Sequence, residues 1–191
     1  MEQYDDLLRT SFKTINKLML LNWRLGMGPY LSIMPRVMGR YMVLVHTGRK
    51  TGLKRRTPVN YVELDDDLYI TAGFGSVSHW YRNIQANPHI EVWLPDGWWQ
   101  AEAKDITAQE QHTAIMREVL KNSGFAALAA GINPYTVSDE ALQEATSDYR
   151  LLHIRRTAPC AGPGGPGDLI WVWPVLLVVA LLARFRWVFR K

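Results

Sequence analysis

The chain has 191 residues, of which 48% are hydrophobic and 21% are charged, with 14 glycines and 10 prolines. These values are close to those of average globular proteins, so they exclude a disordered or fibrous chain and favour one compact domain with short appendages. Cys160 is the only cysteine, which excludes an intrachain disulfide, and the N-terminus lacks the pattern of a cleaved signal peptide. We therefore expect the main body to lie in a reducing cytoplasm.

The net charge of +4 arises at one end of the chain. Lys and Arg number 22 against 18 acidic residues, and four of the basic residues lie in the last eight positions: Arg184, Arg186, Arg190 and Lys191. Without them, basic and acidic residues are equal in number. A nucleic-acid partner requires a basic face on the folded body, so the sequence argues against nucleic acid as a partner.

Residues 1–39 are expected to form an amphipathic helix followed by an apolar segment. Apolar side chains recur every three or four residues over 4–25, as at Ile15, Met19 and Trp23, which is the helical period. The following stretch, 26–39, stays apolar and is interrupted by prolines. This segment either covers a core or serves as a membrane-surface helix or substrate lid.

The stretch 41–106 predicts a mainly antiparallel sheet. Its β-branched and aromatic runs are separated by turn residues, and they predict five strands, over 41–47, 56–64, 68–74, 89–94 and 98–106. The turns 65–67 and 95–97 are short enough to join neighbouring strands as hairpins. Only one gap holds a predicted helix, 78–86, whereas a doubly wound parallel sheet requires a helix in each gap.

Two helices and a sixth strand are predicted after residue 106. Thr107 followed by Glu110 forms a capping-box pattern, which predicts a helix running to about Leu120 or on to Ala130. A short helix is expected to begin at Ser138, and residues 149–156 predict a strand that returns to the sheet. The predicted class is therefore α+β, with a mainly antiparallel sheet and flanking helices.

The segment 48–58 reads Gly-Arg-Lys-Thr-Gly-Leu-Lys-Arg-Arg-Thr-Pro and places five basic residues within eight positions. Its glycines allow tight turns, and its Arg, Lys and Thr side chains are donors that suit a phosphate or another anion. It is either such an anion cradle or a solvated basic hairpin loop, and its spacing is not that of a Walker A loop. Pro58 either marks an edge strand or opens the strand ladder for a flat ligand.

Other patterns exclude several chemistries. The run 162–167 matches the glycine spacing of a dinucleotide site, but its two prolines lack the N–H groups that a pyrophosphate needs, so we interpret 158–168 as a linker. The five histidines and Cys160 do not have the spacing of metal ligands, so no metal is expected. No Gly-x-Ser-x-Gly motif supports a hydrolase.

Residues 169–191 are predicted to be a membrane-associated tail. The apolar run 169–183 would span about 22 Å as a helix, against ~30 Å of bilayer hydrocarbon. Tryptophans lie at its start and basic residues at its end, an arrangement in which aromatic anchoring and snorkelling extend the reach. Because the run is short, we expect it to lie in the interface or to insert partly, at the cytoplasmic face of the cell membrane. The alternative is a core or partner helix.

Three motifs together resemble the deazaflavin-dependent nitroreductase and quinone reductase family. They are Thr-Gly-Arg-Lys-Thr-Gly at 47–52, Arg-Thr-Pro at 56–58, and the span 72–88 with its Trp-Tyr-Arg-Asn and Ala-Asn-Pro sequences. The resemblance covers 40–106 closely and 107–156 loosely, so we take 40–157 as the cofactor-binding domain. It implies a split β-barrel, similar to those of pyridoxine-phosphate oxidases and flavin reductases, that binds the reduced deazaflavin coenzyme F-420.

The resemblance also implies which residues bind the coenzyme. The basic loop would contact its phosphate and acidic tail, the next strand would lie along its ring, and the turn and helix start after residue 72 would close around the remaining phosphate and the ring edge. The residues implied are Arg49, Lys50, Thr51, Arg55 or Arg56, Thr57, Pro58, Val59, Gly73, Ser76, Ser78, His79 and Trp80. Family members that reduce quinones carry a tyrosine-rich segment near 124–127, which is absent here, so Tyr61 and Tyr135 are the candidate catalytic proton donors.

The implied function is that of an oxidoreductase. It would transfer a hydride from reduced F-420 to a small apolar acceptor such as a quinone, an enone or a nitro compound. Two alternatives stay open because a fold does not fix a function: an FMN-dependent split-barrel oxidoreductase, and a non-catalytic flavin- or haem-binding protein at the membrane. The oligomeric state is also open.

Overall fold

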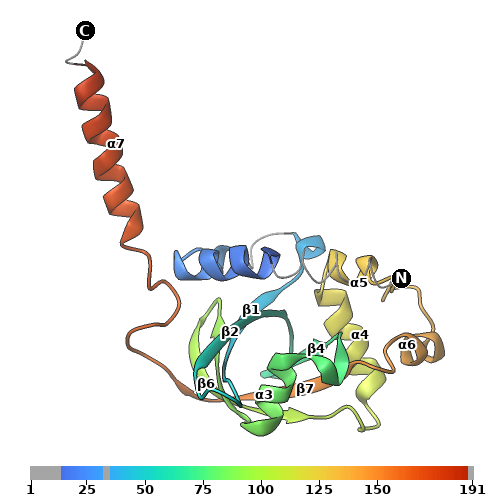
Figure 1. Ribbon diagram of the computed structural model, residues 1–191. Coiled ribbons are helices and arrows are strands. Elements are labelled where there is room, and N and C mark those ends of the chain that lie inside the picture. The colour runs from blue at the N-terminus through green and yellow to red at the C-terminus, as the bar shows by residue number, and fades with distance from the viewer. Residues whose placement is uncertain (1–13, 32–34, 189–191) are drawn as a thin grey trace.

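The computed structural model describes residues 14–31 and 35–188. At its centre is a curled sheet surrounded by short helices, and the last helix extends away from this body (Figure 1). The strands are β1 (Tyr41–Thr47), β2 (Lys54–Asn60), β3 (Val62–Leu64), β4 (Asp67–Ala72), β5 (His89–Leu94), β6 (Gly97–Asp105) and β7 (Arg150–Pro159). Their order in the sheet is β2-β1-β5-β6-β7-β4-β3.

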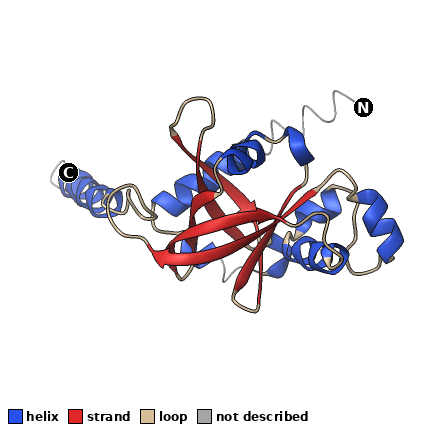
Figure 2. Ribbon diagram, turned by 90° about the horizontal axis from the view of Figure 1, so that it is seen from below, coloured by secondary structure: helices blue, strands red, loops and turns tan. Residues whose placement is uncertain are grey.

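Every pair of neighbouring strands is antiparallel, and three pairs are hairpins: β1 with β2, β3 with β4, and β5 with β6. The two edge strands, β2 and β3, are consecutive in the chain and separated only by Tyr61. The sheet therefore has to curl until its two edges approach each other near this residue. Figure 2 shows the curled sheet. The predicted α+β class with a split barrel is confirmed. The single strand predicted over 56–64 is wrong, because the strand is interrupted at Tyr61 and a second strand follows.

Three apolar clusters hold this arrangement. The inner face of the sheet fills the barrel with residues such as Met42, Leu44 and Val59. On the outer face, Val43, Val45 and Trp93 pack against Trp23 of the helix over residues 14–24. This contact favours the interpretation of the N-terminal helix as a cover for a core. The first residues of the predicted helix, 4–13, lie outside the described part of the chain.

Helices α4 (His112–Asn122), α5 (Phe125–Ala129) and α6 (Asp139–Ala145) bury the third cluster against the sheet. The helix predicted from Thr107 begins five residues later, so the capping box is wrong. The Thr107 hydroxyl instead accepts a hydrogen bond from the Leu151 backbone, 2.9 Å away, and ties the end of β6 to β7. Gly124 has φ +58 and ends any continuous helix toward Ala130. Ser138 caps α6 by accepting a bond from the Ala141 backbone, as predicted.

Shorter helical elements complete the body: α2 (Gly28–Leu31), η1 (Arg36–Met38), η2 (Gly75–Val77) and α3 (His79–Ala86). The predicted helix 78–86 is confirmed, since α3 begins one residue later and ends at the same residue.

The linker is packed against the body. Asp168 forms a two-pronged ion pair with Arg24 at the end of the N-terminal helix, and the Gly167 backbone donates to the Trp23 carbonyl. A side chain at Gly165 would overlap the Trp98 ring. After this clamp, α7 (Val172–Val188) begins, and its apolar side chains from Val175 to Phe185 are exposed on all sides. Within the described residues, no helix is long and apolar enough to span a bilayer.

Candidate functional site

The basic loop is a compact turn between β1 and β2. The Gly48 backbone donates to the Leu53 carbonyl at 2.9 Å, and the Gly48 carbonyl accepts bonds from the backbones of Thr51 and Gly52. Gly52 has φ +66, a conformation that strongly favours glycine. Lys50 is exposed at the tip and forms no ion pair within the described residues. The loop therefore holds its shape through its own backbone and leaves this cation available.

Helix α3 joins the loop through Asn83. The side-chain oxygen of Asn83 accepts hydrogen bonds from the Arg49 backbone at 3.2 Å and from the Arg49 guanidinium at 2.9 Å. The same guanidinium lies 3.4 Å from the His79 carbonyl oxygen. Two of the motifs identified in the sequence, 34 residues apart, thus meet in space.

A buried polar chain continues from Asn83 into the barrel. The Asn83 amide nitrogen lies 3.2 Å from Nδ1 of His46, and Nε2 of His46 lies 3.1 Å from the Thr57 hydroxyl. His46 is only 3% exposed. Burial, with a smaller contribution from the Arg55 charge, lowers the pKa of His46 to about 4, so the ring is neutral at physiological pH.

Sequence reasoning missed His46 and Asn83. A signal was present in each case, because His46 interrupts an otherwise apolar strand and Asn83 belongs to the Trp-Tyr-Arg-Asn motif.

The two faces of β2 have different surroundings. Arg55 and Thr57 point to the same side as Val59, toward the barrel interior, since Thr57 contacts His46 and Val59 joins the inner cluster. Arg56 points outward, where its guanidinium lies 5.2 Å from the centre of the Trp93 ring and donates to the Gly164 carbonyl at 2.8 Å. Of the two arginines that were candidates to assist the loop, Arg55 lies on the side of Asn83 and Arg56 does not.

Pro58 also faces outward, opposite Val43 of β1. Because β2 is an edge strand, its missing N–H costs the sheet no ladder bond on the free side, which agrees with the edge-strand interpretation. A surface cavity of about 420 Å³ lies on this outer side and is lined by Val45, Thr47, Lys54 and Glu91 among others. Lys54 is ion-paired with Glu91 there, so it is not free for another anion.

The turn after β4 lies directly before α3. Gly73 follows the last residue of β4. Gly75 has φ +57 at a point where a side chain would overlap the Asp148 carbonyl, so the tight turn requires glycine there. The Ser76 carbonyl accepts a bond from Arg82 of α3 at 2.7 Å. The Ser78 side chain makes no capping bond to α3. Trp80 packs partly buried against the inner cluster. The structure thus places Gly73, Ser76, Ser78, His79 and Trp80 in one segment beside the loop.

Tyr61 lies away from the basic loop, although it packs partly buried against the inner cluster. It follows the last residue of β2, six positions beyond Arg55, which is about 20 Å at the usual rise of a strand. Burial, together with the charges of Glu63 and Asp96, raises the pKa of Tyr61 to about 12. The phenol therefore stays protonated at neutral pH.

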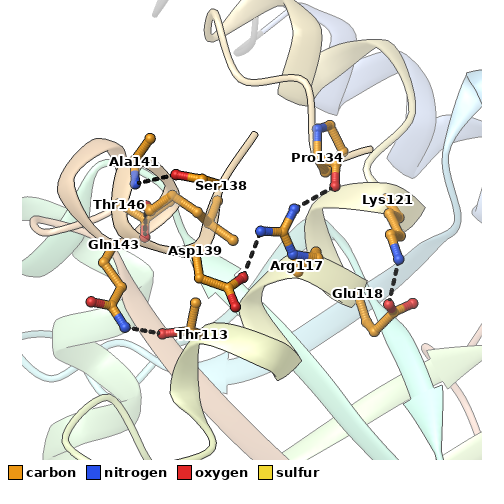
Figure 3. A network of polar contacts seen from close by, with 11 residues as sticks. Thr113, Arg117, Glu118, Lys121, Pro134, Ser138, Asp139, Ala141, Gln143 and Thr146 are labelled. Carbon is orange, nitrogen blue, oxygen red and sulfur yellow. Dashed lines mark hydrogen bonds and ion pairs between the residues drawn. The ribbon is translucent and has the colours of Figure 1, made fainter. Parts of the chain in front are cut away.

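Tyr135 lies on the loop between α5 and α6 and is 68% exposed. It lines a cavity of about 260 Å³ with Val37, Leu120 and Leu128. Arg117 of α4 fixes this loop by donating to the Pro134 carbonyl at 2.8 Å and pairing with Asp139 at 2.7 Å (Figure 3). The cavity is mainly apolar, and Arg117 holds the loop that forms one side of it. Its lining comes from the helices and this loop rather than from the basic loop.

Comparison with known proteins gives the family. Three solved structures are similar over most of the body: an F420-H2 dependent reductase (20% identity, TM-score 0.43, covering 61% of this chain and 94% of that chain), a conserved hypothetical protein from Mycobacterium tuberculosis (16%, 0.45, 68% and 87%), and the heme storage protein HutZ from Vibrio cholerae (12%, 0.42, 66% and 86%). The family model described as F420H(2)-dependent quinone reductase matches residues 31–138, which is more than half of the chain. The chain is therefore a member of the F420H(2)-dependent quinone reductase family, an F-420-dependent oxidoreductase whose cofactor is coenzyme F-420.

Proposed function

We propose that this protein transfers a hydride from reduced coenzyme F-420 to a small apolar acceptor, such as a quinone, an enone or a nitro compound. The observation that carries the proposal is the contact of Arg49 with Asn83 and His79, which unites the basic loop with α3. The site then consists of the loop, the start of α3 and the inner face of β2.

The residues of this site fit the chemistry of the coenzyme. Its tail carries a phosphate and carboxylates, and the loop offers Lys50 and Arg55, neither of which forms an ion pair within the described part of the chain. Charge-assisted hydrogen bonds from such cations are stronger than neutral ones. Arg49, Lys50, Thr51 and Arg55 would hold the tail, and Thr57 and Val59 would face the ring.

When bound, the coenzyme supplies the hydride, so the protein needs neither a nucleophile nor a metal of its own for that step. Its residues bind the tail, orient the ring and exclude water from the acceptor. Tyr61 or Tyr135 would supply the accompanying proton. Both phenols are candidates through their chemistry, and the phenylalanine variants Tyr61→Phe and Tyr135→Phe test which one is used.

The proposal is tested by the oxidation of reduced F-420 with the purified full chain. When a quinone is added, we expect the concentration of the reduced coenzyme to fall, which is monitored by its absorbance. The same assay with an enone and with a nitro compound ranks the acceptors. Equilibrium titration with F-420, FMN and haem separates the alternatives. Tight binding of FMN or haem without binding of F-420 would contradict the proposal.

We further propose that α7 holds the protein at the cytoplasmic face of the cell membrane, near lipid-soluble acceptors. Leu177, Leu181 and Phe185 are each about 60% exposed, and no polar face interrupts the apolar surface before Arg184. A helix that is apolar all round is typical of burial in a protein core or in lipid. Its apolar part is shorter than the hydrocarbon layer, which favours partial insertion or an interfacial position.

Flotation with lipid vesicles tests this second proposal. A truncation after Trp171 removes α7 and the hydrogen bond from Trp173 to the Leu25 carbonyl, but it keeps β7 and the Arg24–Asp168 pair. We expect the full chain to float with vesicles and the truncated chain to stay in the soluble fraction. The matched control is the full chain with Leu177→Lys and Leu181→Lys, which keeps the length of the helix. Equal partitioning of all three forms would make α7 a packing or oligomerisation element.

A further inference from the structure

We propose that Asn83 and His46 are positioning residues that orient the Thr57 hydroxyl as a hydrogen-bond donor into the coenzyme site. The acceptor would be a carbonyl oxygen or an unprotonated ring nitrogen of the deazaflavin. The inference rests on the proposed function for the identity of the ligand, but the direction of the donor follows from the protein alone.

The orientation of the Asn83 amide is fixed first. Arg49 contacts the same amide atom with its backbone N–H at 3.2 Å and its guanidinium at 2.9 Å. Both Arg49 groups can only donate, so the atom that receives them is the amide oxygen. The amide nitrogen therefore faces His46.

The tautomer of His46 follows from that orientation. The Asn83 amide nitrogen can only donate, so Nδ1 of His46, 3.2 Å away, is the unprotonated acceptor. A neutral imidazole then carries its hydrogen on Nε2. The ring is 3% exposed and faces the positive charge of Arg55, and both conditions disfavour the imidazolium.

Thr57 is the end of the chain. Nε2–H of His46 donates to the Thr57 oxygen at 3.1 Å, so the hydroxyl hydrogen points elsewhere. Among the residues that the structure describes, no acceptor for this hydrogen is found. Thr57 is half-buried, on the same face of β2 as Arg55. Arg49, which would bind the tail, is thereby connected to the Thr57 hydroxyl through the buried side chains of Asn83 and His46. The hydroxyl is oriented before the coenzyme binds.

The tautomer is tested on the free protein. Long-range proton–nitrogen NMR spectra of the full chain labelled on histidine should show His46 protonated on Nε2 and not on Nδ1. In Asn83→Asp the carboxylate cannot donate, so the ring should carry a hydrogen on Nδ1. A wild-type ring protonated on Nδ1 would overturn the inference without reference to any ligand.

Binding of F-420 to the full chain tests the donor. Thr57→Val, which keeps the shape but removes the hydroxyl, should weaken binding about fivefold, as for one neutral hydrogen bond, and Thr57→Ser should stay within about twofold of wild type. In the Asn83→Asp background, Thr57→Val should have little further effect, because the hydroxyl has already turned toward His46.

The outcomes separate the two proposals. If Thr57→Val binds as tightly as wild type while the loop variants bind weakly, the positioning inference is wrong and the proposed function stands. If Thr57→Val has the same effect with and without Asn83→Asp, the coupling through His46 is wrong. If the wild type does not bind F-420, the proposed function fails and so does the assigned acceptor.

Discussion

Both faces of β2 carry basic residues, but these residues have different contacts on the two faces. On the outer face, Lys54 is paired with Glu91, and Arg56 lies over Trp93 and binds the linker. On the inner face, Arg55 has no ion-pair partner within the described residues and stands beside His46, whose pKa its charge helps to lower. The number of basic residues in a loop is therefore a poor guide to anion binding. Strand alternation decides which of them are free.

The largest expected effect concerns Arg49 and Lys50, the cations of the loop that precedes β2. The double variant Arg49→Ala with Lys50→Ala should weaken F-420 binding by well over tenfold, since each charge-assisted contact contributes roughly 1.5 to 3 kcal/mol. Fluorescence titration measures the dissociation constant. The matched control is Lys54→Ala with Arg56→Ala, which removes the same charge from the outer face and should leave affinity nearly unchanged. Equal losses in both variants would show that the outer-face cations of β2 bind the coenzyme as well.

The second effect is a dependence of stability on pH from the inner face alone. The folded pKa of His46 is about 4 against 6.5 for a free histidine, so the unfolded chain binds the proton more readily. The contribution of neutral His46 to the free energy of unfolding is therefore complete above about pH 6.5. It is lost as the pH falls toward 4, by about 3 kcal/mol at most. Urea unfolding of wild type and His46→Gln measures it, with exposed His89→Gln as the control. A parallel pH profile for wild type and His46→Gln would contradict it.

The third effect belongs to the outer face. Arg56→Ala should lower the free energy of unfolding by about 1 to 2 kcal/mol, because it removes the contact with the Trp93 ring and the bond to the Gly164 carbonyl. Chemical denaturation measures the change. Arg55→Ala, one position away, should affect stability little but lower the affinity for F-420. The opposite result, with Arg55→Ala lowering stability and Arg56→Ala lowering affinity, would contradict the placement of the two arginines on these faces.

The smallest effect is expected at Lys54. Its side chain is 65% exposed, so its ion pair with Glu91 contributes about 0.5 kcal/mol to stability and is screened by salt. Lys54→Met should therefore shift the unfolding midpoint slightly at low salt and not at high salt. A large shift that persists at high salt would show that Lys54 supports the outer face by packing rather than by charge.

Much of the fold could be predicted because it depends on local signals. Alternating apolar residues and short turns located the hairpins, and Ser138 marked the start of α6. The predicted ends of helices were wrong where tertiary contacts compete with local sequence patterns. Thr107 has the sequence of a helix cap, but its hydroxyl is used by Leu151, 44 residues away.

The candidate site was predictable only in part for the same reason. The basic loop and the α3 motif are visible as runs of residues, but the face on which each arginine lies depends on the register of β2 with β1. His46 and Asn83 are 37 residues apart, and neither carries a charge that would draw attention to it. Their role follows from which donor meets which acceptor, and that information exists only in the folded chain.

The clamp between Arg24 and Asp168 bears on the order in which the molecule is assembled. The two residues are 144 positions apart, and all seven strands lie between them. Contacts of such long sequence separation form late, because the loop they close is expensive until the intervening chain is ordered. During synthesis the barrel can therefore form before this ion pair does, and Trp23 can already pack against β1 and β5 at that stage. The ion pair then joins the end of the N-terminal helix to the segment that leads into α7.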